Sequence, residues 1–221
     1  MIKFAPFTVD ELSKKRQQTI RNSLKRCNVK RIAPSEYIDE LWRVNREAVK
    51  NYKNADNAGS EEQFKQAVLH NGLEYWGAFS AETGEMAGWM SCQNNGDWTE
   101  TISAKYAPSA QRAVRPSEAL HYHVLNHYLN RLGQKYVCSG TRNINHKTHA
   151  QEYKITNWNF RRVHCRLHIV YNPRIKWIVV CLYPMRALLK LLDFETHFHQ
   201  LNNLLKMEKI ARQCRTKRNK V

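Results

Sequence analysis

The stretch EYWGAFSAETGEMAGWMSCQNNGDWTETISAKYA, residues 74–107, decides the fold. Aromatic and small apolar residues fill the segments on both sides of Thr83 and Gly84, which is the pattern of a β-hairpin. A second group of turn residues at 94–97 leads into a third run, 98–107. The stretch therefore predicts three consecutive antiparallel strands.

Helices and further strands are predicted on both sides of this meander. Ser60 and Gln63 match a capping box at the start of one helix, and Gly133 marks the end of another. Apolar residues repeat with helical spacing in several segments and alternate in others. The predicted helices are 34–52, 60–70, 116–133 and 146–158, and the predicted strands outside the meander are 29–33, 135–143 and a long final strand at 160–171.

Both ends of the chain are basic and helical in pattern. Residues 10–26 carry a thin apolar stripe of Leu12, Ile20 and Leu24. Residues 174–213 have the pattern of two helices and lead into a basic tail. We therefore expect a basic N-terminal helical appendage at 1–28, a central domain at 29–172, and C-terminal amphipathic helices with a basic tail at 173–221.

The composition excludes several classes of protein. The chain has 36 Lys and Arg against 19 Asp and Glu, a net charge of +17, yet its 42% hydrophobic content is enough for a core. It lacks the glycine motifs of P-loop NTPases and of dinucleotide-binding Rossmann enzymes. Its six cysteines form no C-x-x-C pair, and its first residues contain no apolar leader, so we expect a cytoplasmic protein with reduced thiols.

The predicted order of elements resembles the GNAT (Gcn5-related N-acetyltransferase) superfamily over residues 29–171. YWGAF, followed by G-x-x-A-G-W, is similar to the second and third strands of that family, and ITNWNFRRVHCRL to its closing helix and strand. The resemblance implies an α+β fold: a mixed, mostly antiparallel sheet flanked by helices, here with a basic N-terminal helix and C-terminal amphipathic helices. LSKKRQQTIRNSLK also resembles the basic helix of Fem-type aminoacyltransferases and of GNAT-like bacterial acyltransferases of envelope or polysaccharide clusters.

The resemblance also implies where an acyl donor binds. GNAT enzymes hold the pyrophosphate of acyl-CoA with a Q/R-x-x-G-x-G/A loop, whose backbone N–H groups point at the anion. The corresponding segment here, QRAVRPSEAL at 111–120, lacks both glycines, and Pro116 has no N–H. Acyl-CoA and aminoacyl-tRNA therefore both stay open as donors. The implied donor-binding residues are Ser103, Ala104, Gln111, Arg112, Arg115, Arg142 and Asn145.

Acyl transfer to an amine needs a base for the amine, donors for the oxyanion and an acid for the leaving group. In the family the site lies where the fourth and fifth strands separate. This implies Glu100 as the base, Tyr153 as the acid, and His146 as a further proton carrier between the fifth strand and the next helix. A solvated glutamate, a core tyrosine and a histidine at a helix start are the structural alternatives.

Neither a metal nor a cysteine nucleophile is expected. The histidines and cysteines of the central domain lack the spacing of zinc ligands. Cys138 lies on a predicted strand, where a cysteine usually behaves as a small hydrophobic residue.

The net charge of +17 indicates an anionic partner, and tRNA and an anionic membrane both fit. Residues 173–193 combine Trp177 and Tyr183 with several Arg and Lys, the pattern of an interfacial helix or of a helix packed on the sheet. Two locations therefore stay open: a purely cytoplasmic one and a peripheral one at the inner membrane face. The basic residues gather in 14–26, at Arg142, Arg161, Arg162 and Arg166, and in 206–220.

Two functions follow from these patterns. The first is a GNAT-like acyl- or aminoacyltransferase that acts on an amine of a cell-envelope sugar or a lipid-linked precursor. The second is a non-catalytic GNAT-shaped module that binds RNA, DNA or anionic membrane through its basic surface. The missing glycines favour the module, and the polar residues around the implied site favour the enzyme.

Overall fold

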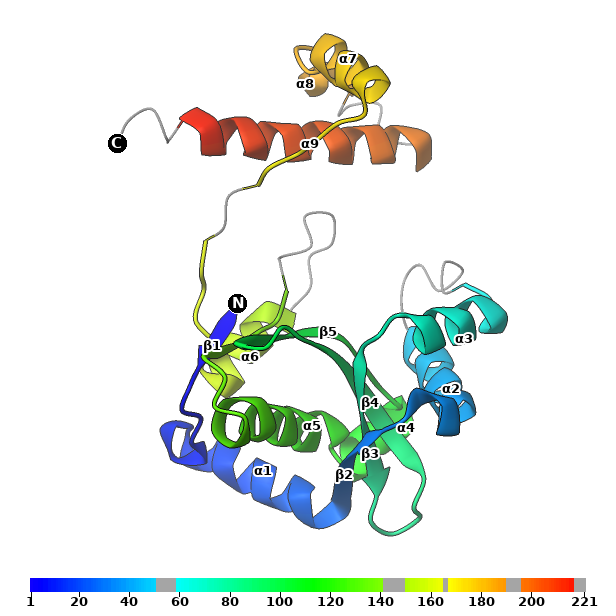
Figure 1. Cartoon of the computed structure of the whole chain (residues 1–221), viewed down its shortest axis with the longest axis vertical. Coiled ribbons are helices and arrows are strands. Elements are labelled where there is room, and N and C mark those ends of the chain that lie inside the picture. Colours follow the sequence, from blue (N-terminus) through cyan, green and yellow to red (C-terminus); the bar gives the residue numbers. More distant parts are fainter. Residues whose placement is uncertain (51–58, 141–149, 165–166, 190–195, 217–221) are drawn as a thin grey trace. The chain divides into compact units, whose positions relative to one another are not determined.

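The computed structural model (Figure 1) describes residues 1–50, 59–140, 150–164, 167–189 and 196–216. The described chain forms two compact units. Unit 1 contains Met1–Thr141 and Ala150–Arg162, and unit 2 contains the described residues from Val163 onward. The predicted domain boundaries at 28 and 172 therefore differ from the boundaries of the two units, because residues 1–28 belong to unit 1.

A six-stranded sheet forms the centre of unit 1, in the order β1-β6-β5-β4-β3-β2. Every neighbouring pair is antiparallel except β5 and β6, which run parallel. This confirms the predicted α+β class with a mixed, mostly antiparallel sheet. The strands are β1 (Ile2–Phe4), β2 (Cys27–Ile32), β3 (Glu74–Ser80), β4 (Met86–Asn94), β5 (Trp98–Tyr106) and β6 (Tyr136–Cys138).

The predicted meander is present as β3, β4 and β5, and its residues alternate between two cores. Trp76 and Met90 face one core, while Tyr75 and Trp89 face the other, as the two-residue period of a strand requires. Apolar side chains on both faces explain why the sequence of the meander is apolar almost throughout. The sheet is therefore covered by helices on both sides (Figure 1).

Helices α2 (Ile38–Val49) and α3 (Glu61–His70) cover one face of the sheet. Leu41 and Val44 of α2 are fully buried against it. The predicted capping box is confirmed, since Ser60 accepts from the backbone of Gln63 and the Gln63 side chain accepts from the backbone of Ser60. A short 3-10 helix, η2 (Pro34–Glu36), precedes α2.

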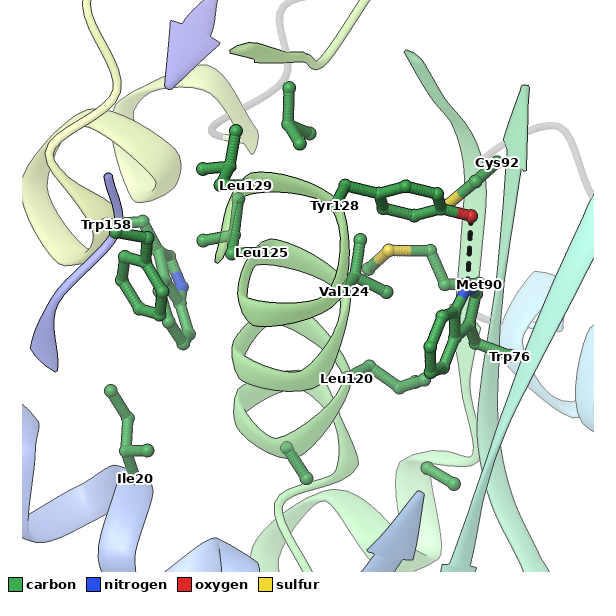
Figure 2. Packing of buried hydrophobic residues seen from close by; sticks show 14 of the residues in the cluster. Ile20, Trp76, Met90, Cys92, Leu120, Val124, Leu125, Tyr128, Leu129 and Trp158 are labelled. Atoms are coloured by element: carbon green, nitrogen blue, oxygen red, sulfur yellow. Dashed lines mark hydrogen bonds between the residues drawn. The ribbon is translucent and has the colours of Figure 1, made fainter. Parts of the chain in front are cut away.

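Helix α5 (Pro116–Leu125) lies against the other face and continues as a π-helical segment, η4 (Asn126–Arg131). Figure 2 shows apolar side chains on both sides of this helix, with Leu120, Val124 and Tyr128 toward the strands and Leu125 and Leu129 toward Trp158. The Trp76 indole donates to the Tyr128 hydroxyl at 3.3 Å. That hydroxyl in turn donates to Glu74, which is also paired with Arg31. Helix α5 and its continuation η4 therefore pack between the sheet on one side and Trp158 on the other.

The basic N-terminal segment is part of unit 1, which corrects the expected appendage. It contains a 3-10 helix, η1 (Val9–Glu11), and α1 (Lys14–Arg26), capped by the Ser13 side chain. Ile20 of α1 is buried in the same core as α5, and Leu24 packs against that core. A thin apolar stripe was thus sufficient to attach α1 to α5.

The predicted final strand at 160–171 is wrong. Among its described residues only Arg161 makes a β-bridge, to Ile2. The position beside β6 is occupied by β1 instead, where Ile2, Lys3 and Phe4 pair with Cys138, Val137 and Tyr136. Because β1 already pairs with β6 on that side, a strand from residues 160–171 has no place next to β6.

Unit 2 contains three helices in its described residues, where two were predicted between 174 and 213. These are α7 (Pro173–Leu182), α8 (Arg186–Leu189) and α9 (Thr196–Thr216). Val179 of α7 and Leu205 of α9 are buried, and the Tyr171 hydroxyl donates to Glu208 of α9 at 2.9 Å. The guanidinium of Arg212 lies 3.8 Å from the centre of the Tyr183 ring and bonds to Glu208.

Candidate active site

The parallel strands β5 and β6 pair over only three residues. Trp98, Thr99 and Glu100 of β5 face Tyr136, Val137 and Cys138 of β6. β5 continues beside β4 to Tyr106, but from Thr101 to Ala104 it has no strand partner on its β6 side among the described residues. We call this side of residues 101–104 the open edge. The two strands that the resemblance places at the site are therefore parallel neighbours, and all three residues of β6 pair with β5.

The two faces of β5 present different groups at the start of the open edge. Thr99 donates to Gln134, which follows η4, and the Thr101 hydroxyl donates to the Cys138 carbonyl at 3.3 Å. Both threonines therefore point to the α5 side, and strand alternation places Glu100 on the opposite face, the side of α2. Glu100 is half-buried, and a Cβ built on Gly140 would lie 3.1 Å from its Oε1.

Two predicted donor-binding residues lie farther along β5. The register shifts between Ser91 and Cys92 of β4, which leaves Ile102 without a partner in the ladder. Beyond this bulge Ser103 lies opposite Ser91 and is half-buried, and Ala104 packs against the α5-side core.

Lys154 lies at the start of the open edge, on the α5 side. Its position is set by α6 (Ala150–Trp158), which Trp158 anchors with a fully buried side chain. The Lys154 ammonium donates to the Thr101 hydroxyl at 3.2 Å and lies 5.8 Å from the centre of the Phe160 ring. Burial lowers the pKa of Lys154 to about 8, against the opposing influence of the nearby thiols of Cys92 and Cys138.

Sequence reasoning missed Lys154, although a signal was present. Lys154 stands four residues before Trp158, so both lie on one face of the helix predicted at 146–158. A cation on the face that carries a buried tryptophan indicates either a buried ion pair or a functional group.

Tyr153 lies in a buried polar cluster between α1, α5 and α6. Its hydroxyl accepts from Arg16 at 2.8 Å and from the Trp158 indole at 3.4 Å, and donates to Glu118 at 3.4 Å. Arg16 is also paired with Glu118 at 3.1 Å. Burial and the neighbouring Glu118 carboxylate raise the pKa of Tyr153.

His121 of α5 borders both Tyr153 and Lys154. Its ring stacks on Trp158 with the centroids 5.3 Å apart, and its Nδ1 lies 2.7 Å from the Ser117 carbonyl. Burial, reinforced by the charge of Lys154, lowers the pKa of His121 to about 3. The ring is therefore neutral at physiological pH. Because a carbonyl only accepts, the proton is on Nδ1 and Nε2 carries none.

The predicted phosphate-binding segment forms α4 (Pro108–Ala113) and the turn into α5. Arg115 precedes the first residue of α5 and has φ of 57°, the left-handed conformation that favours glycine. The backbone thus keeps a glycine-like turn although the glycines are absent. Arg112 and Arg115 are exposed, whereas the Gln111 amide is held by the Ser117 hydroxyl at 2.8 Å.

Helix α1 supports this turn, a contact that the sequence did not suggest. The Ser23 hydroxyl donates to the Arg115 carbonyl at 2.8 Å, and Arg26 donates to the Ala113 carbonyl at 3.1 Å. Arg26 therefore lies beside the turn that carries Arg112 and Arg115.

Three predicted site residues, Arg142, Asn145 and His146, lie outside the described residues. Within the described ranges, no three His, Cys, Asp or Glu side chains converge as metal ligands would. No helix of the described chain combines the length and the apolar content needed to cross a bilayer.

A separate pocket of about 530 Å³ lies between β2, the β3–β4 turn and α2. Its cations Lys30 and Arg43 are bonded to Tyr37 and Glu47, respectively. These groups already satisfy one another, so the open edge of β5 is the better candidate for chemistry.

No protein-family model and no curated protein matches this chain. Solved structures do match it, among them a "possible acetyltransferase" from Clostridium difficile 630, with a TM-score of 0.52 and 8% identity over 66% of this chain and 98% of that one. L-PGS from Bacillus licheniformis matches with a TM-score of 0.46 and 16% identity, over 66% of this chain and 46% of that one. The aminoglycoside N-acetyltransferase AAC(6')-Iy in complex with CoA matches with a TM-score of 0.43 and 11% identity, over 67% and 95%. The six-stranded open sheet with its flanking helices has the GNAT-like acetyltransferase fold.

Proposed function

We propose that this protein is an acyltransferase that moves an acyl group from a thioester donor, such as acyl-CoA, to an amine. One observation carries the proposal: the open edge of β5 begins between Glu100 on one face of the sheet and Lys154 on the other. A thioester that lay along this edge could pair with the backbone groups of residues 101–104 that face away from β4. Its carbonyl carbon would then lie between two groups able to move protons.

In this proposal Glu100 removes the proton from the attacking amine, directly or through a water molecule. An ammonium ion has no lone pair, so the acceptor becomes a nucleophile only after it loses a proton. Glu100 projects to the α2 side, so the acceptor approaches from there and the donor occupies the edge. Tyr153, the acid implied by the resemblance, has its hydroxyl engaged by Arg16 and Glu118.

The phosphate groups of the donor are assigned to the α4–α5 turn. Arg112 and Arg115 are exposed there, and Arg26 of α1 lies against the same turn. Arginine side chains would replace the backbone N–H groups that a glycine loop offers to a pyrophosphate. Ser103 and Ala104 would contact the donor between this turn and Glu100.

The finer predictions from the sequence stay proposals. An aminoacyl-tRNA donor and a Fem-type specificity have no support in the observations above, so acyl-CoA is the donor to test first. An acceptor amine on an envelope sugar or a lipid-linked precursor is likewise a prediction. Arg142, Asn145 and His146 keep their predicted roles without structural support.

The proposal is tested with acetyl-CoA as the donor and a panel of amines, including an aminoglycoside and a diamine. Saturable acetyl-CoA binding and enzyme-dependent release of the CoA thiol, matched by acetylated amine in mass spectra, are the expected results. A chain that binds neither acetyl-CoA nor CoA at micromolar concentrations would contradict the proposal.

Arg115→Gly separates a binding role of Arg115 from a structural one. Glycine adopts the φ of 57° without the steric penalty of about 1–2 kcal/mol that a side chain meets there, so folding stability should be unchanged or higher. CoA affinity should nevertheless fall about tenfold, because a charge-assisted phosphate contact is lost. Arg131→Ala, which removes an exposed arginine of η4 outside this turn, is the control for charge. Unchanged CoA affinity in Arg115→Gly, measured by calorimetry, would remove Arg115 from the site.

A second candidate function, binding to an anionic membrane surface, is favoured by α7. Trp177 is 71% exposed within the described structure, and Ile178 and Val180 are also exposed. Arg174 and Lys176 stand beside them in the sequence, and exposed apolar and cationic side chains together fit an acidic lipid surface.

Co-sedimentation with vesicles tests this candidate. Binding to vesicles that contain phosphatidylglycerol is expected, with little binding to pure phosphatidylcholine. Trp177→Ala combined with Lys176→Glu should reduce it about tenfold or more, since each cation near the surface contributes about 1 kcal/mol. Lys14→Glu on α1 is the control, because it changes the net charge by the same amount as Lys176→Glu; it should bind nearly as wild type. The reverse order of effects would assign the binding to α1.

A further inference from the structure

We propose that Lys154 is the proton donor to the thiolate that leaves the acyl donor. This inference rests on the acyltransferase function proposed above and adds a residue that the resemblance does not imply. Its basis is the position of the Lys154 ammonium, 3.2 Å from the Thr101 hydroxyl, where the open edge of β5 begins.

The reaction needs an acid on the side of the sheet opposite the base. The amine nitrogen attacks the thioester carbonyl carbon, and the tetrahedral intermediate then breaks its C–S bond, leaving the electron pair on sulfur. Glu100 takes the proton from the nitrogen, and Lys154 gives a proton to the sulfur. The products are an amide and a free thiol, and solvent restores both side chains. Acid and base on opposite faces avoid a direct proton exchange between them.

The other groups that face this position are poor acids. Cys92 on β4 is buried, which raises the pKa of its thiol to about 12. His121 on α5 is neutral, and its Nδ1 proton is held by the Ser117 carbonyl. The Tyr153 hydroxyl, on the same helix as Lys154, is bonded within the cluster of Arg16 and Glu118. Among the described residues, the thiol of Cys138 on β6 also influences Lys154; Cys138 pairs with Glu100, so its side chain lies on the α2 side, and it can be removed by mutation.

Lys154 also has suitable acid strength and support. The pKa of about 8 to which burial lowers it is close to that of an ordinary thiol, and proton transfer is most effective between groups of similar pKa near the working pH. At pH 7 most Lys154 side chains carry the proton that the reaction needs. Trp158, one turn further along α6, is fully buried and holds the helix in place, and the ammonium is bonded to the Thr101 hydroxyl.

The binding arm of the test uses CoA itself, with desulfo-CoA as the blank. An ammonium beside the bound thiol should favour its thiolate, so ultraviolet difference spectra at pH 7 should show about tenfold more thiolate for bound CoA than for free CoA. Lys154→Met should abolish this excess of thiolate in bound CoA, whereas Lys154→Arg and Cys138→Ser should keep it. Circular dichroism checks that each variant is folded.

The kinetic arm follows thiol release from acetyl-CoA with an accepted amine. Rates in the wild type should fall as the pH rises through about 8, because Lys154 loses its proton there. Lys154→Arg, whose guanidinium does not give up its proton, should lower kcat about 100-fold with little change in KM. Cys138→Ser should retain the wild-type pH profile.

Failure of this inference is distinguishable from failure of the proposed function. If CoA binds and the thiolate excess is equal in wild type and Lys154→Met, Lys154 is not the donor although the acyltransferase proposal survives. If the rate of Cys138→Ser no longer fell as the pH rose through about 8, the proton would come from Cys138 and the inference would be overturned. If CoA does not bind, both proposals are wrong.

Discussion

Arg16→Met is expected to lower the free energy of unfolding by about 3–5 kcal/mol, the usual cost of removing one partner of a buried ion pair. The Arg16 side chain is 11% exposed and that of Glu118 is 9% exposed, and their nearest atoms are 3.1 Å apart. Arg16 also donates to Tyr153 and lies over the rings of Tyr153 and Trp158. Removing it leaves the Glu118 carboxylate uncompensated between three helices. Urea denaturation measures the loss.

Lys15→Met is the matched control, because Lys15 is the neighbouring cation of α1 and is exposed. Its effect should stay within about 0.5 kcal/mol. The double variant Arg16→Met with Glu118→Leu should recover much of the stability, since it removes both buried charges. An Arg16→Met protein as stable as Lys15→Met would show that the pair does not hold α1 to α5.

Glu100→Gln is expected to lower acyl transfer by about 100- to 10,000-fold, the usual contribution of a general base. The substitution keeps the size of the side chain and removes only its ability to accept a proton from the amine. Glu100 is half-buried and is not a core residue, so the free energy of unfolding should change by about 0.5 kcal/mol or less. Steady-state rates of thiol release and urea denaturation of the same preparation give the two values.

Glu85→Gln serves as the control for this experiment. Glu85 is exposed at the end of the β3–β4 turn, at the opposite end of β4 from Gln93, the residue that pairs with Glu100, and its substitution should leave transfer unchanged. CoA affinity should be the same in both variants, because Glu100 is assigned to the acceptor side. Full activity in Glu100→Gln would mean that another group, or solvent, deprotonates the amine.

The position of Arg16 also changes how the net charge of +17 is interpreted. Sequence reasoning counted Arg16 with Lys14 and Lys15 as one surface cluster. The structure directs Arg16 inward to Glu118 and leaves Lys14, Lys15, Arg21 and Lys25 exposed. An electrostatic test on α1 must therefore spare Arg16, because its loss would lower stability and binding together.

The sequence by itself determined the features that depend on neighbours along the chain. The meander of β3, β4 and β5 follows from the apolar runs on both sides of Thr83 and Gly84, and the start of α3 follows from Ser60 and Gln63. Periodicity and capping are local, so one segment contains the whole signal. The placement of Glu100 on a strand was predictable for the same reason, whereas its neighbour β6 was implied by the resemblance to the GNAT superfamily.

Only the tertiary structure decided which segments meet. Val163, Leu167 and Ile169 alternate as a strand would, yet β1 pairs with β6, and the three residues of β1 are too few for a periodic signal. Arg16 and Glu118 are 102 positions apart, and nothing in a basic run marks which cation will be buried. Tyr153 and Lys154 are adjacent in the chain, but consecutive helical residues point about 100° apart. The packing of α6 therefore directs Tyr153 into the cluster with Glu118 and Lys154 to the open edge of β5. The sequence alone does not show which of the two residues takes which position.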